Sequence, residues 1–528
     1  MPKIRMPARS FFDRTHDVKG PIDLGKMYPV LHEEIFPGDT FSDVSELMIR
    51  MQPMIRPIAT EMTAYLRVFF IRNWTIMDKF DEMISMGPDG ESDVTVPMNP
   101  ANYTVEEGGV WDWLNVNPGV YAEGQFNMLP LRAYNKVYND WYRPQNQVPD
   151  EVDLDDTTMK HTTWERDLFT QALPFTQRGP QVVMPLGTTA PVIGTGMSLG
   201  LTDGTTNYGL TNDNNSGLFS LTTQYGKTLP SSRGSTVTVM PSNTANMGIT
   251  TDPTKSGLMT DLSQASGIPI NDWRNYLQVQ SWMELNALGG VRYPELVLAH
   301  FGVVTPDARV ERAEYLGSMK VPVIVSEVLQ TGETTETSPQ GNMAGHGIGA
   351  NSRGLFKRSF TEHGWLIGIL TVVPKSGYQQ GIPLEYQRES ALDFPWPLFT
   401  RLGMRDMPVK TLFTGAYLKD GEVVSPGTTG AVWTPVDNPD ETFGYYTIYD
   451  ELRYKTNSVH GKFRSDMAYW HLNRIFKDKP ALSKEFVECR PQTERVMAVP
   501  SEEDATIQIV HRLKGYRELP KNPTPWHF

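Results

Sequence analysis

The residues that could carry chemistry in this chain of 528 residues are few and scattered. Gly226-Lys227-Thr228 matches the end of a phosphate-binding loop, but Leu221 stands where that motif requires its first glycine. The ten histidines include no pair at His-x-x-x-His spacing, and Cys489 is the single cysteine, so the sequence gives a zinc site no support. We therefore expect a protein that is not an enzyme and that holds no cofactor and no metal.

Two kinds of charged cluster allow more than one interpretation. The acidic groups Asp153–Asp156 and Glu502–Asp504 offer oxygen ligands to Ca²⁺, but neither has the spacing of a known calcium loop, so solvated surface is the favoured interpretation. Arg453-Tyr454-Lys455 and Lys462-Phe463-Arg464 alternate cations with rings. That alternation suits single-stranded nucleic acid, because rings stack on bases while cations meet phosphates, and it equally suits a strand with one wet face.

The bulk composition excludes several classes of protein. The formal net charge is −13, so the chain does not coat nucleic acid by itself, since phosphate binding is driven by Lys and Arg. One cysteine rules out an intrachain disulfide and fits folding in a reducing cytoplasm. Residues 1–7 lack the apolar core of a signal peptide, and the longest apolar run, Trp365–Val373, is too short to span a bilayer as a helix. We expect no membrane insertion.

Strand patterns lie near both ends of the chain, and helix patterns lie between them. Strands are predicted at residues 40–73 (two strands), 366–373, 442–450 and 505–512. Helices are predicted at Trp74–Met86, Leu131–Tyr142 and Asn271–Leu288. The glycine-rich segment Gly341–Gly349 lacks the strand–turn–helix context of a dinucleotide site and predicts a flexible loop. Because early strands must pair with late ones, the pattern favours a Greek-key sandwich such as a jelly roll and argues against βαβ repeats.

Four segments of the chain differ in composition. Residues 1–20 are basic and contain prolines, so they predict an extended N-terminal arm. Residues 21–180 would form the first part of the sandwich with helical insertions. Residues 181–265 are rich in Gly, Thr, Ser and Asn and predict a surface insertion. Residues 266–528 would complete the sandwich with long loops and end in an extended, proline-rich tail.

Several long blocks of the sequence, taken in their order along the chain, indicate one known family. Ser10–His16 reads SFFDRTH, His300–Arg309 reads HFGVVTPDAR, and Ser359–Gly364 reads SFTEHG; Leu129–Arg143 adds a further block. With these blocks, the chain resembles the major capsid protein of the Microviridae, small tailless phages with circular single-stranded DNA, and especially the gokushovirus-like branch. The resemblance covers most of the chain and is weakest at residues 181–265.

The resemblance implies a mainly β fold, an eight-stranded antiparallel jelly roll with large loop and helical insertions. It implies a virion subunit, assembled in the cytoplasm of a bacterial host, that self-associates through five-, three- and two-fold contacts into a T=1 icosahedral shell around a circular single-stranded DNA genome. A small basic DNA-binding virion protein is expected as a partner that supplies the positive charge this chain lacks. The insertion at 181–265 stands where the family carries a three-fold protrusion thought to engage a host receptor.

The candidate contact residues follow from charge and from position in the insertion. The candidates for facing DNA are Lys3, Arg5, Arg9 and Arg14. The candidates for host contact are Asn212, Asp213, Asn214 and Asn215. A non-enzymatic carbohydrate-binding β-sandwich module is the alternative function, since it would also explain the strands and polar loops, although it predicts a signal peptide and usually some cysteines.

Overall fold

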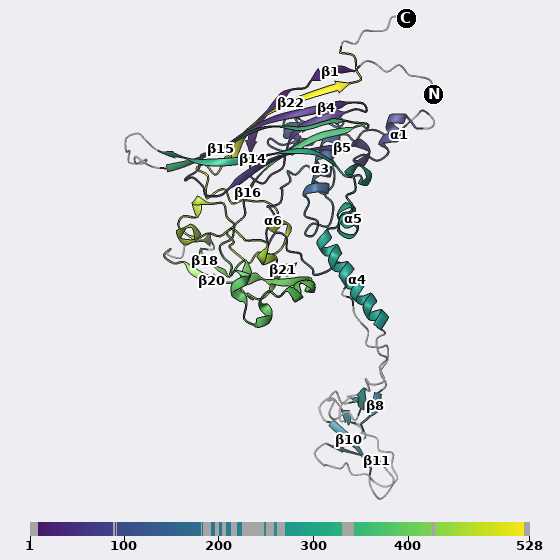
Figure 1. The fold of residues 1–528 in the computed structure, drawn as a ribbon, viewed down its shortest axis with the longest axis vertical. Helices are drawn as coiled ribbons and strands as arrows, with labels where there is room; N and C mark the ends of the chain where they lie inside the picture. The colour runs from purple at the N-terminus through teal and green to yellow at the C-terminus, as the bar shows by residue number, and fades with distance from the viewer. Residues whose placement is uncertain are drawn as a thin grey trace. The chain divides into compact units, whose positions relative to one another are not determined.

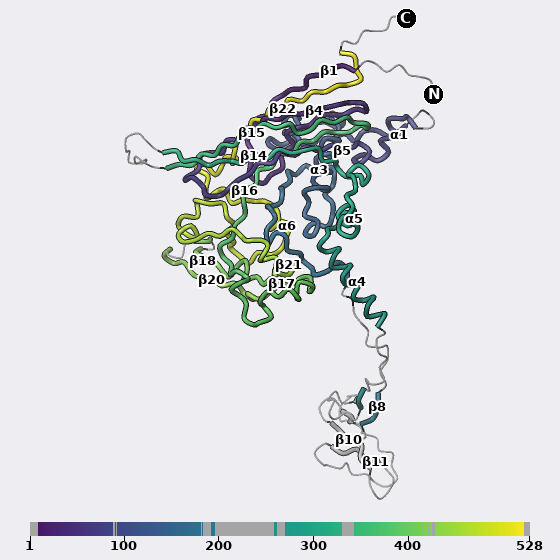
Figure 2. The backbone as a smooth tube through the Cα atoms, viewed as in Figure 1, coloured from purple at the N-terminus to yellow at the C-terminus, as the bar shows by residue number. Residues whose placement is uncertain are grey.

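The structure, a computed structural model, divides into two compact units, residues 1–178 with 284–528 and residues 179–283. Figure 1 draws the elements as a ribbon, and Figure 2 follows the backbone as a tube. The residues that the structure describes are 9–87, 90, 92–180, 182, 192–195, 200–202, 207–212, 219–223, 248–249, 258–260, 270–329, 343–420, 422–424 and 428–521.

An antiparallel sheet of nine strands dominates the first unit. Its strands are β1 (Ser10–Asp13), β2 (His16–Ile22), β3 (Tyr28–Ile35), β4 (Thr40–Met51), β5 (Met62–Arg72), β14 (Glu314–Leu329), β15 (Met343–Ser359), β16 (Gly364–Pro374) and β22 (Ala505–Arg517). β1 and β2 pair one after the other with β22. The remaining order across the sheet is β22-β4-β15-β14-β5-β16-β3, so strands from the two ends of the chain lie side by side (Figure 2).

This order defines two halves, β2-β22-β4-β15 and β3-β16-β5-β14. Strand β14 joins them, because Glu314–Val323 pairs with β5 and Ile324–Leu329 pairs with β15. When β1 and β2 count as one strand, the eight strands alternate between the halves, except that the consecutive strands β5 and β14 share one half, which is the double Greek-key order of a jelly roll. The expected mainly β fold is confirmed, and the strand order matches the jelly roll.

The hydrophobic core lies between the two halves. Side chains of β4 alternate between buried and exposed positions, as they do in a strand with one face on a core. Leu47 and Ile49 of β4 belong to one buried cluster with Leu66 of β5, Leu370 of β16 and Ile509 of β22. Residues from both halves therefore close a single core. On the other face of β4 and β22, most of the alternate residues are exposed.

A helical layer covers the outer face of the other half, which explains why β16 is buried on both faces. The layer contains α3 (Leu129–Val137), which continues into the π-helical turn η2 (Tyr138–Tyr142). Leu131 and Tyr134 of α3 share a buried cluster with Ile367 of β16. The helix predicted at residues 131–142 is therefore confirmed, with its start two residues earlier.

The helix predicted at Trp74–Met86 is shorter in the structure. The chain forms a 3₁₀ turn, η1 (Asn73–Thr75), and then α1 (Phe80–Ser85). Lys79 lies between them in the left-handed backbone region with a φ of 57°. Because that conformation is unfavourable inside a right-handed helix, it separates the two elements although the apolar spacing continues across them.

Residues 378–487 pack around a third cluster, which includes Phe413, Phe443 and Phe486. The short elements of this region are β17 (Met404–Pro408), β18 (Gly415–Lys419), β19 (Glu422–Val423), β20 (Val432–Pro435), β21 (Thr442–Thr447) and α6 (Lys484–Val487). The strand predicted at 442–450 corresponds to β21. The other small elements of the first unit are α2 (Val110–Trp113), β6 (Tyr103–Val105), β7 (Gly119–Tyr121), α5 (Tyr293–Phe301) and 3₁₀ turns, among them η4 (Asp307–Val310) and η9 (Asp450–Leu452).

The second unit, residues 179–283, contains the insertion expected at 181–265. Its strands are β8 (Val192–Gly194), β9 (Gly200–Thr202), β10 (Asn207–Asn212), β11 (Phe219–Thr223), β12 (Gly248–Ile249) and β13 (Leu258–Thr260). Helix α4 (Ile270–Gly289) begins in this unit and ends in the first, and it confirms the helix predicted at 271–288. In the part of the chain that the structure describes, no helix is both long enough and apolar enough to cross a membrane.

Two segments differ from their sequence-based expectations. Residues 10–20, expected within an extended arm, form β1 and part of β2 and pair with β22. Residues 343–349, expected within a flexible loop, begin β15. A Cβ atom at Gly345 would lie 2.7 Å from the carbonyl oxygen of Arg56, and one at Gly349 would lie 2.9 Å from that of Pro322. The glycines therefore permit close backbone approach within a sheet. Glycine content alone predicts a loop here, because it does not show which backbone segments lie nearby.

Gly25 provides a test of the packing between the start and the end of the chain. Its φ is +82°, and an added Cβ would lie 2.0 Å from the carbonyl oxygen of Cys489. Gly124 has a similar φ of +76° but open space around it. We predict that Gly25→Ala lowers the free energy of unfolding by about 3 kcal/mol or more, while Gly124→Ala costs only about 1–2 kcal/mol. Denaturant unfolding measures both, and equal losses would contradict the packing.

Candidate functional site: exposed apolar surfaces and the network behind them

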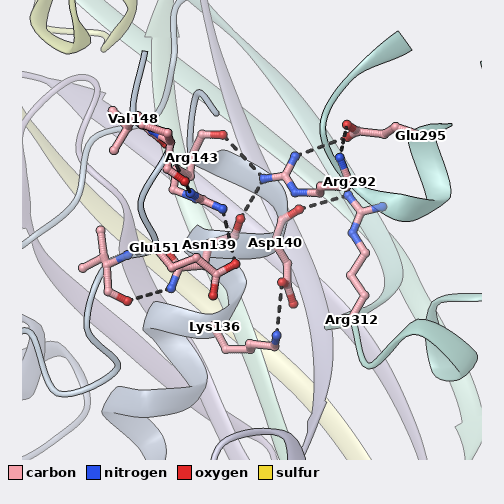
Figure 3. A network of polar contacts seen from close by, with 11 residues as sticks. Lys136, Asn139, Asp140, Arg143, Val148, Glu151, Arg292, Glu295 and Arg312 are labelled. Atoms are coloured by element: carbon pink, nitrogen blue, oxygen red, sulfur yellow. Dashed lines mark hydrogen bonds and ion pairs between the residues drawn. The ribbon is translucent and has the colours of Figure 1, made fainter. Parts of the chain in front are cut away.

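A polar network joins α3, η2 and the start of β14 (Figure 3). Asp140 of η2 is buried; its Oδ2 accepts the backbone N–H of Ala313 at 2.8 Å, and its Oδ1 lies 3.3 Å from Nζ of Lys136. Burial raises the pKa of Asp140, and Lys136 opposes that shift. In the same network, Nη1 of Arg143 donates to the carbonyl of Val148 at 3.2 Å. Since a buried charge needs partners, these contacts fix the helical layer to the sheet.

Arg292 and Arg312 extend the network to the segment that follows α4. Nη2 of Arg292 donates to the carbonyl oxygen of Asn139 at 2.7 Å, and burial lowers the pKa of Arg292. Nη2 of Arg312 donates to the carbonyl oxygen of Asp140 at 3.0 Å, and its guanidinium lies 3.7 Å from the ring centre of Trp141. Figure 3 shows both arginines pointing into the network from one side. The network therefore anchors α5 and its flanking loop to η2.

The anchored segment presents large apolar side chains to solvent. Helix α5 begins after Arg292, whose backbone N–H donates to Oε2 of Glu295 at 3.4 Å, and the helix ends before Gly302, whose φ is 67°. The exposed apolar residues of the helix and of the loop after it, here called the α5 surface, are Tyr293, Leu298, Phe301, Val303 and Val304. Phe301 is 74% exposed and Val304 is 78% exposed, so the network holds apolar side chains in water rather than in the core.

A second exposed apolar surface lies on residues 382–402. It is built on three 3₁₀ turns, η5 (Leu384–Gln387), η6 (Ala391–Asp393) and η7 (Pro397–Leu402). We call it the loop patch, and its exposed residues are Ile382, Tyr386, Leu392, Phe394, Trp396, Leu398 and Leu402. Tyr386 is 81% exposed and Leu398 is 78% exposed.

The loop patch is held in a defined conformation by polar contacts. The backbone N–H of Trp396 donates to the hydroxyl of Tyr449 at 3.0 Å, and its indole N–H donates to the carbonyl of Ala391 at 2.8 Å. Nη2 of Arg388 lies 3.4 Å from Oε1 of Glu451. Single exposed apolar residues are normal on a protein surface, but ordered groups of them mark contact sites for other macromolecules. The α5 surface and the loop patch are therefore the candidate functional site.

The predicted DNA-facing residues are only partly described. Lys3 and Arg5 lie outside the described residues. Nη2 of Arg9 lies 3.0 Å from Oε1 of Glu518, and Nη2 of Arg14 lies 2.9 Å from Oε2 of Glu33. Among the host-contact candidates, Asn212 is the last residue of β10, and Asp213, Asn214 and Asn215 lie outside the described residues.

The other clusters singled out in the sequence have structural partners. Asp155 pairs with Arg132 at 2.7 Å, and the buried Asp504 accepts the backbone N–H of Leu24 at 2.9 Å. Arg453 pairs with Asp450 at 2.9 Å and Lys455 pairs with Glu385 at 3.1 Å, so their charges are already compensated. Over the described ranges, no group of three or more His, Cys, Asp and Glu side chains is placed to hold a metal ion.

Two further groups of residues are of types that occur in catalytic sites, and they were not among the residues singled out from the sequence. Gly196-x-Ser198-x-Gly200 has the spacing of a hydrolase nucleophile elbow, but the flanking elements are the three-residue strands β8 and β9 instead of a strand and a helix, and residues 196–199 lie outside the described part. In the core, Oγ of Ser45 lies 2.5 Å from Oδ2 of Asp43 and 2.8 Å from Nδ1 of His511. All three are buried, so this trio cannot meet a substrate.

The chain matches known proteins along almost its whole length. A family model described as "Capsid protein (F protein)" matches residues 3–526. Capsid protein VP1 of Chlamydia phage 1 is 30% identical over 588 aligned positions, which cover 98% of this chain and 95% of that protein. Capsid protein VP1 of Bdellovibrio phage phiMH2K is 31% identical, with 93% of this chain and 90% of that protein covered. Capsid protein VP1 of Spiroplasma virus 4 is 28% identical, with 98% and 95% covered.

The fold and these matches define a structural protein of a virus particle. The chain belongs to the capsid F-protein family of the Microviridae phages. As a capsid protein, it self-assembles into a shell and resides in the virion. The assignment favours the shell subunit over the carbohydrate-binding module.

Asp393 provides a pH-dependent test of how the loop patch is held. It accepts hydrogen bonds from the backbone N–H and the hydroxyl of Ser390, each at 2.8 Å, and it lies 3.2 Å from Arg405. These contacts, led by the Ser390 N–H, lower the pKa of Asp393 to about 2. The pKa of Asp393 is lower in the folded state than its unfolded value of 3.8, so the charged carboxylate stabilises the folded state at pH values above 3.8. This contribution disappears as the pH falls toward 2.

We therefore predict that Asp393→Asn lowers the melting temperature at pH 7 and pH 5 by similar amounts. The difference from the wild-type protein should shrink below about pH 4 and vanish near pH 2. Thermal melts across this range measure it. A difference that stays constant down to pH 2 would show that the charge on Asp393 is not what holds the turn.

Proposed function

We propose that this protein forms a small T=1 icosahedral shell that encloses a circular single-stranded DNA genome. The observation that carries the proposal is the exposed, ordered apolar surface of the single chain, on α5 and on the loop patch. Ordered apolar side chains in contact with water are unfavourable, and their burial between subunits would drive assembly.

The presence of two different surfaces supports closed assembly. A ring of identical subunits about a five-fold or three-fold axis requires one surface of a subunit to meet a different surface of the next. A two-fold contact requires a surface that meets itself. The α5 surface and the loop patch lie on separate elements of the same unit, so they can supply the two sides of a ring contact, with charged rims that set the register.

Helix α4 adds a further apolar surface. Ile270, Trp273 and Leu277 are each more than half exposed, although an isolated helix draws most of its stability from packing. Contact with further copies of the chain would cover these residues. Because α4 begins in one unit and ends in the other, such a contact would also stabilise the helix that connects them.

The net charge of −13 supports the proposal of a small basic virion protein as partner, because a shell of acidic subunits cannot neutralise a genome alone. Arg9 and Arg14 are each paired with a carboxylate, Glu518 and Glu33, so they would meet phosphate only in competition with those carboxylates. Assembly in the cytoplasm of the bacterial host agrees with the single, buried Cys489, which needs no oxidising compartment.

We also propose the insertion as the segment that contacts a host receptor. Its separation into its own compact unit, and its sequence rich in Asn, Thr and Gly around Asn212–Asn215, support this role. Polar loops carried by a separate unit can vary without disturbing the sandwich.

Substitution in the loop patch tests the proposal. We predict that the purified wild-type protein sediments as closed particles of one size, alone or with its basic partner, and that Tyr386→Asp with Leu398→Asp leaves unassembled subunits. Burying two new charges in each contact should reduce the particle yield at least tenfold. Sedimentation velocity and negative-stain microscopy measure the yield.

The matched control is Val120→Asp. Val120 is 70% exposed on the short strand β7, outside both surfaces, so this variant should assemble as the wild type does. Wild-type yield from the loop-patch variant would contradict the proposed contact. Absence of particles from the wild-type protein, even with the basic partner, would contradict the proposed shell.

A further inference from the structure

The helical layer leaves one part of the outer sheet face open. Tyr65 and Arg67 of β5 lie there, and Lys320 of β14 is the direct cross-strand neighbour of Tyr65. The open part borders a cavity of about 460 Å³, which η2 and residues 162–166 close on its other sides. This volume is within the range of pockets that hold small organic groups.

Half of the twelve residues that line this cavity are aromatic. Four of the rings form one group: the ring centre of Phe69 lies 5.6 Å from that of Trp141, 6.3 Å from that of Tyr142 and 5.8 Å from that of Tyr315. Tyr315 is 39% exposed, so it offers part of its ring to a ligand. Phe69 and Tyr142 are buried and support Tyr315 from behind, so the partly exposed ring of Tyr315 is the platform on which a flat, unsaturated ring can stack.

Cations border the same rings. The guanidinium carbon of Arg67 lies 4.7 Å from the ring centre of Tyr65, and Nζ of Lys320 lies 5.4 Å from it. Across the described residues, Arg67, Lys320 and the exposed Arg166 take part in no ion pair with a carboxylate. Glu165 is the one carboxylate in the lining, and its Oε1 accepts the hydroxyl of Tyr65 at 2.8 Å. An acidic chain thus keeps a local excess of positive charge beside a stacking platform.

We propose that this cavity binds an unstacked base of single-stranded DNA, with Arg67, Lys320 and Arg166 bound to the flanking phosphates. Stacking on rings together with cations along the backbone is how single strands are held without sequence preference. The inference rests on the proposed function, since it assumes that the enclosed genome is single-stranded DNA.

A neighbouring cavity offers room for a second nucleotide. Its volume is about 480 Å³, and it shares Trp141, Tyr142, Thr163, Trp164 and Arg166 with the first, so the two lie next to each other. A strand that places a base against Tyr315 would reach this second cavity past Arg166, which lines both. By contrast, the Arg–aromatic segment around Tyr454 has its cations paired with Asp450 and Glu385, which leaves them less free to bind phosphate.

Binding to a labelled single strand tests the proposal on the full-length protein, in unassembled subunits and in particles. The probe is a fluorescein-labelled oligothymidine of about 20 nucleotides, and anisotropy gives the dissociation constant at several salt concentrations. We predict that Arg67→Ala with Lys320→Ala weakens binding about tenfold and makes its salt dependence shallower, because two phosphate contacts are lost. Tyr315→Ala should weaken binding by a similar factor, while Tyr315→Phe, which keeps the ring, should bind as the wild type does.

The charge-matched control is Lys357→Ala with Lys419→Ala. Both lysines are exposed and lie outside the cavity, and the variant has the same change in net charge. Thermal melts of every variant check that it is folded. Ultraviolet crosslinking of packaged, iodouridine-substituted DNA, mapped by mass spectrometry, should modify Tyr315 or Trp141.

The outcomes separate this inference from the proposed function. Equal weakening by the control pair, or unchanged binding by folded Arg67, Lys320 and Tyr315 variants, would overturn the inference even if particles form normally. Crosslinks confined to other segments of the chain would overturn it as well. A failure of the wild-type protein to form particles would instead count against the shell, and the binding comparison in subunits would still decide on the cavity.

Discussion

The pairing of β22 is the constraint on which the rest of the structure depends. This last strand lies between β4 on one edge and β1 with β2 on the other, so residues near both ends of the chain meet in adjacent ladders. Arg517 at its end lies 3.1 Å from Glu33 and 3.2 Å from Asp39, and Glu33 also binds Arg14. The sandwich is therefore complete only when the first and last strands are both in place, and the segments between them leave the sheet as insertions. Because the entropy of closing a loop grows slowly with its length, long insertions between fixed strands are tolerated.

That arrangement separates stability from function within one chain. The core between the two half-sheets and the helical layer over β16 provide a rigid body. The network around Asp140 and Arg292 then fixes α5 to this body, and hydrogen bonds to Trp396 fix the loop patch. A shell subunit has no need of a catalytic pocket. It needs surfaces of defined shape that are stable in isolation yet gain from contact with other copies, and ordered apolar residues on rigid supports meet that need.

The sequence predicts those elements whose signal is local. β4, β16 and β22 follow from alternation or from an apolar run, and α3 and α4 follow from apolar residues at helical spacing. β1 and β2 could not be predicted in this way, because a short polar segment becomes a strand only through a partner some 500 residues away, at Lys514 for example. The start of β15 was hidden by its glycines, which are required by close backbone approach rather than by flexibility.

The candidate site was less predictable than the fold. Composition alone does not show that Tyr386 and Leu398 are exposed, since apolar residues are usually buried. Charge alone marked Arg9 and Arg14 as nucleic-acid contacts, but whether a cation is free depends on carboxylates such as Glu518 and Glu33 that the fold brings beside it. Pairing across the sheet likewise places Lys320 beside Tyr65, which are distant in the sequence.

The most direct test of the account is an image reconstruction of the assembled particle by electron cryomicroscopy. The account predicts a closed shell of sixty copies, the number that T=1 symmetry fixes, in which the α5 surface and the loop patch are buried at contacts between subunits. A closed shell in which both surfaces face solvent, or an assembly without icosahedral symmetry, would contradict it.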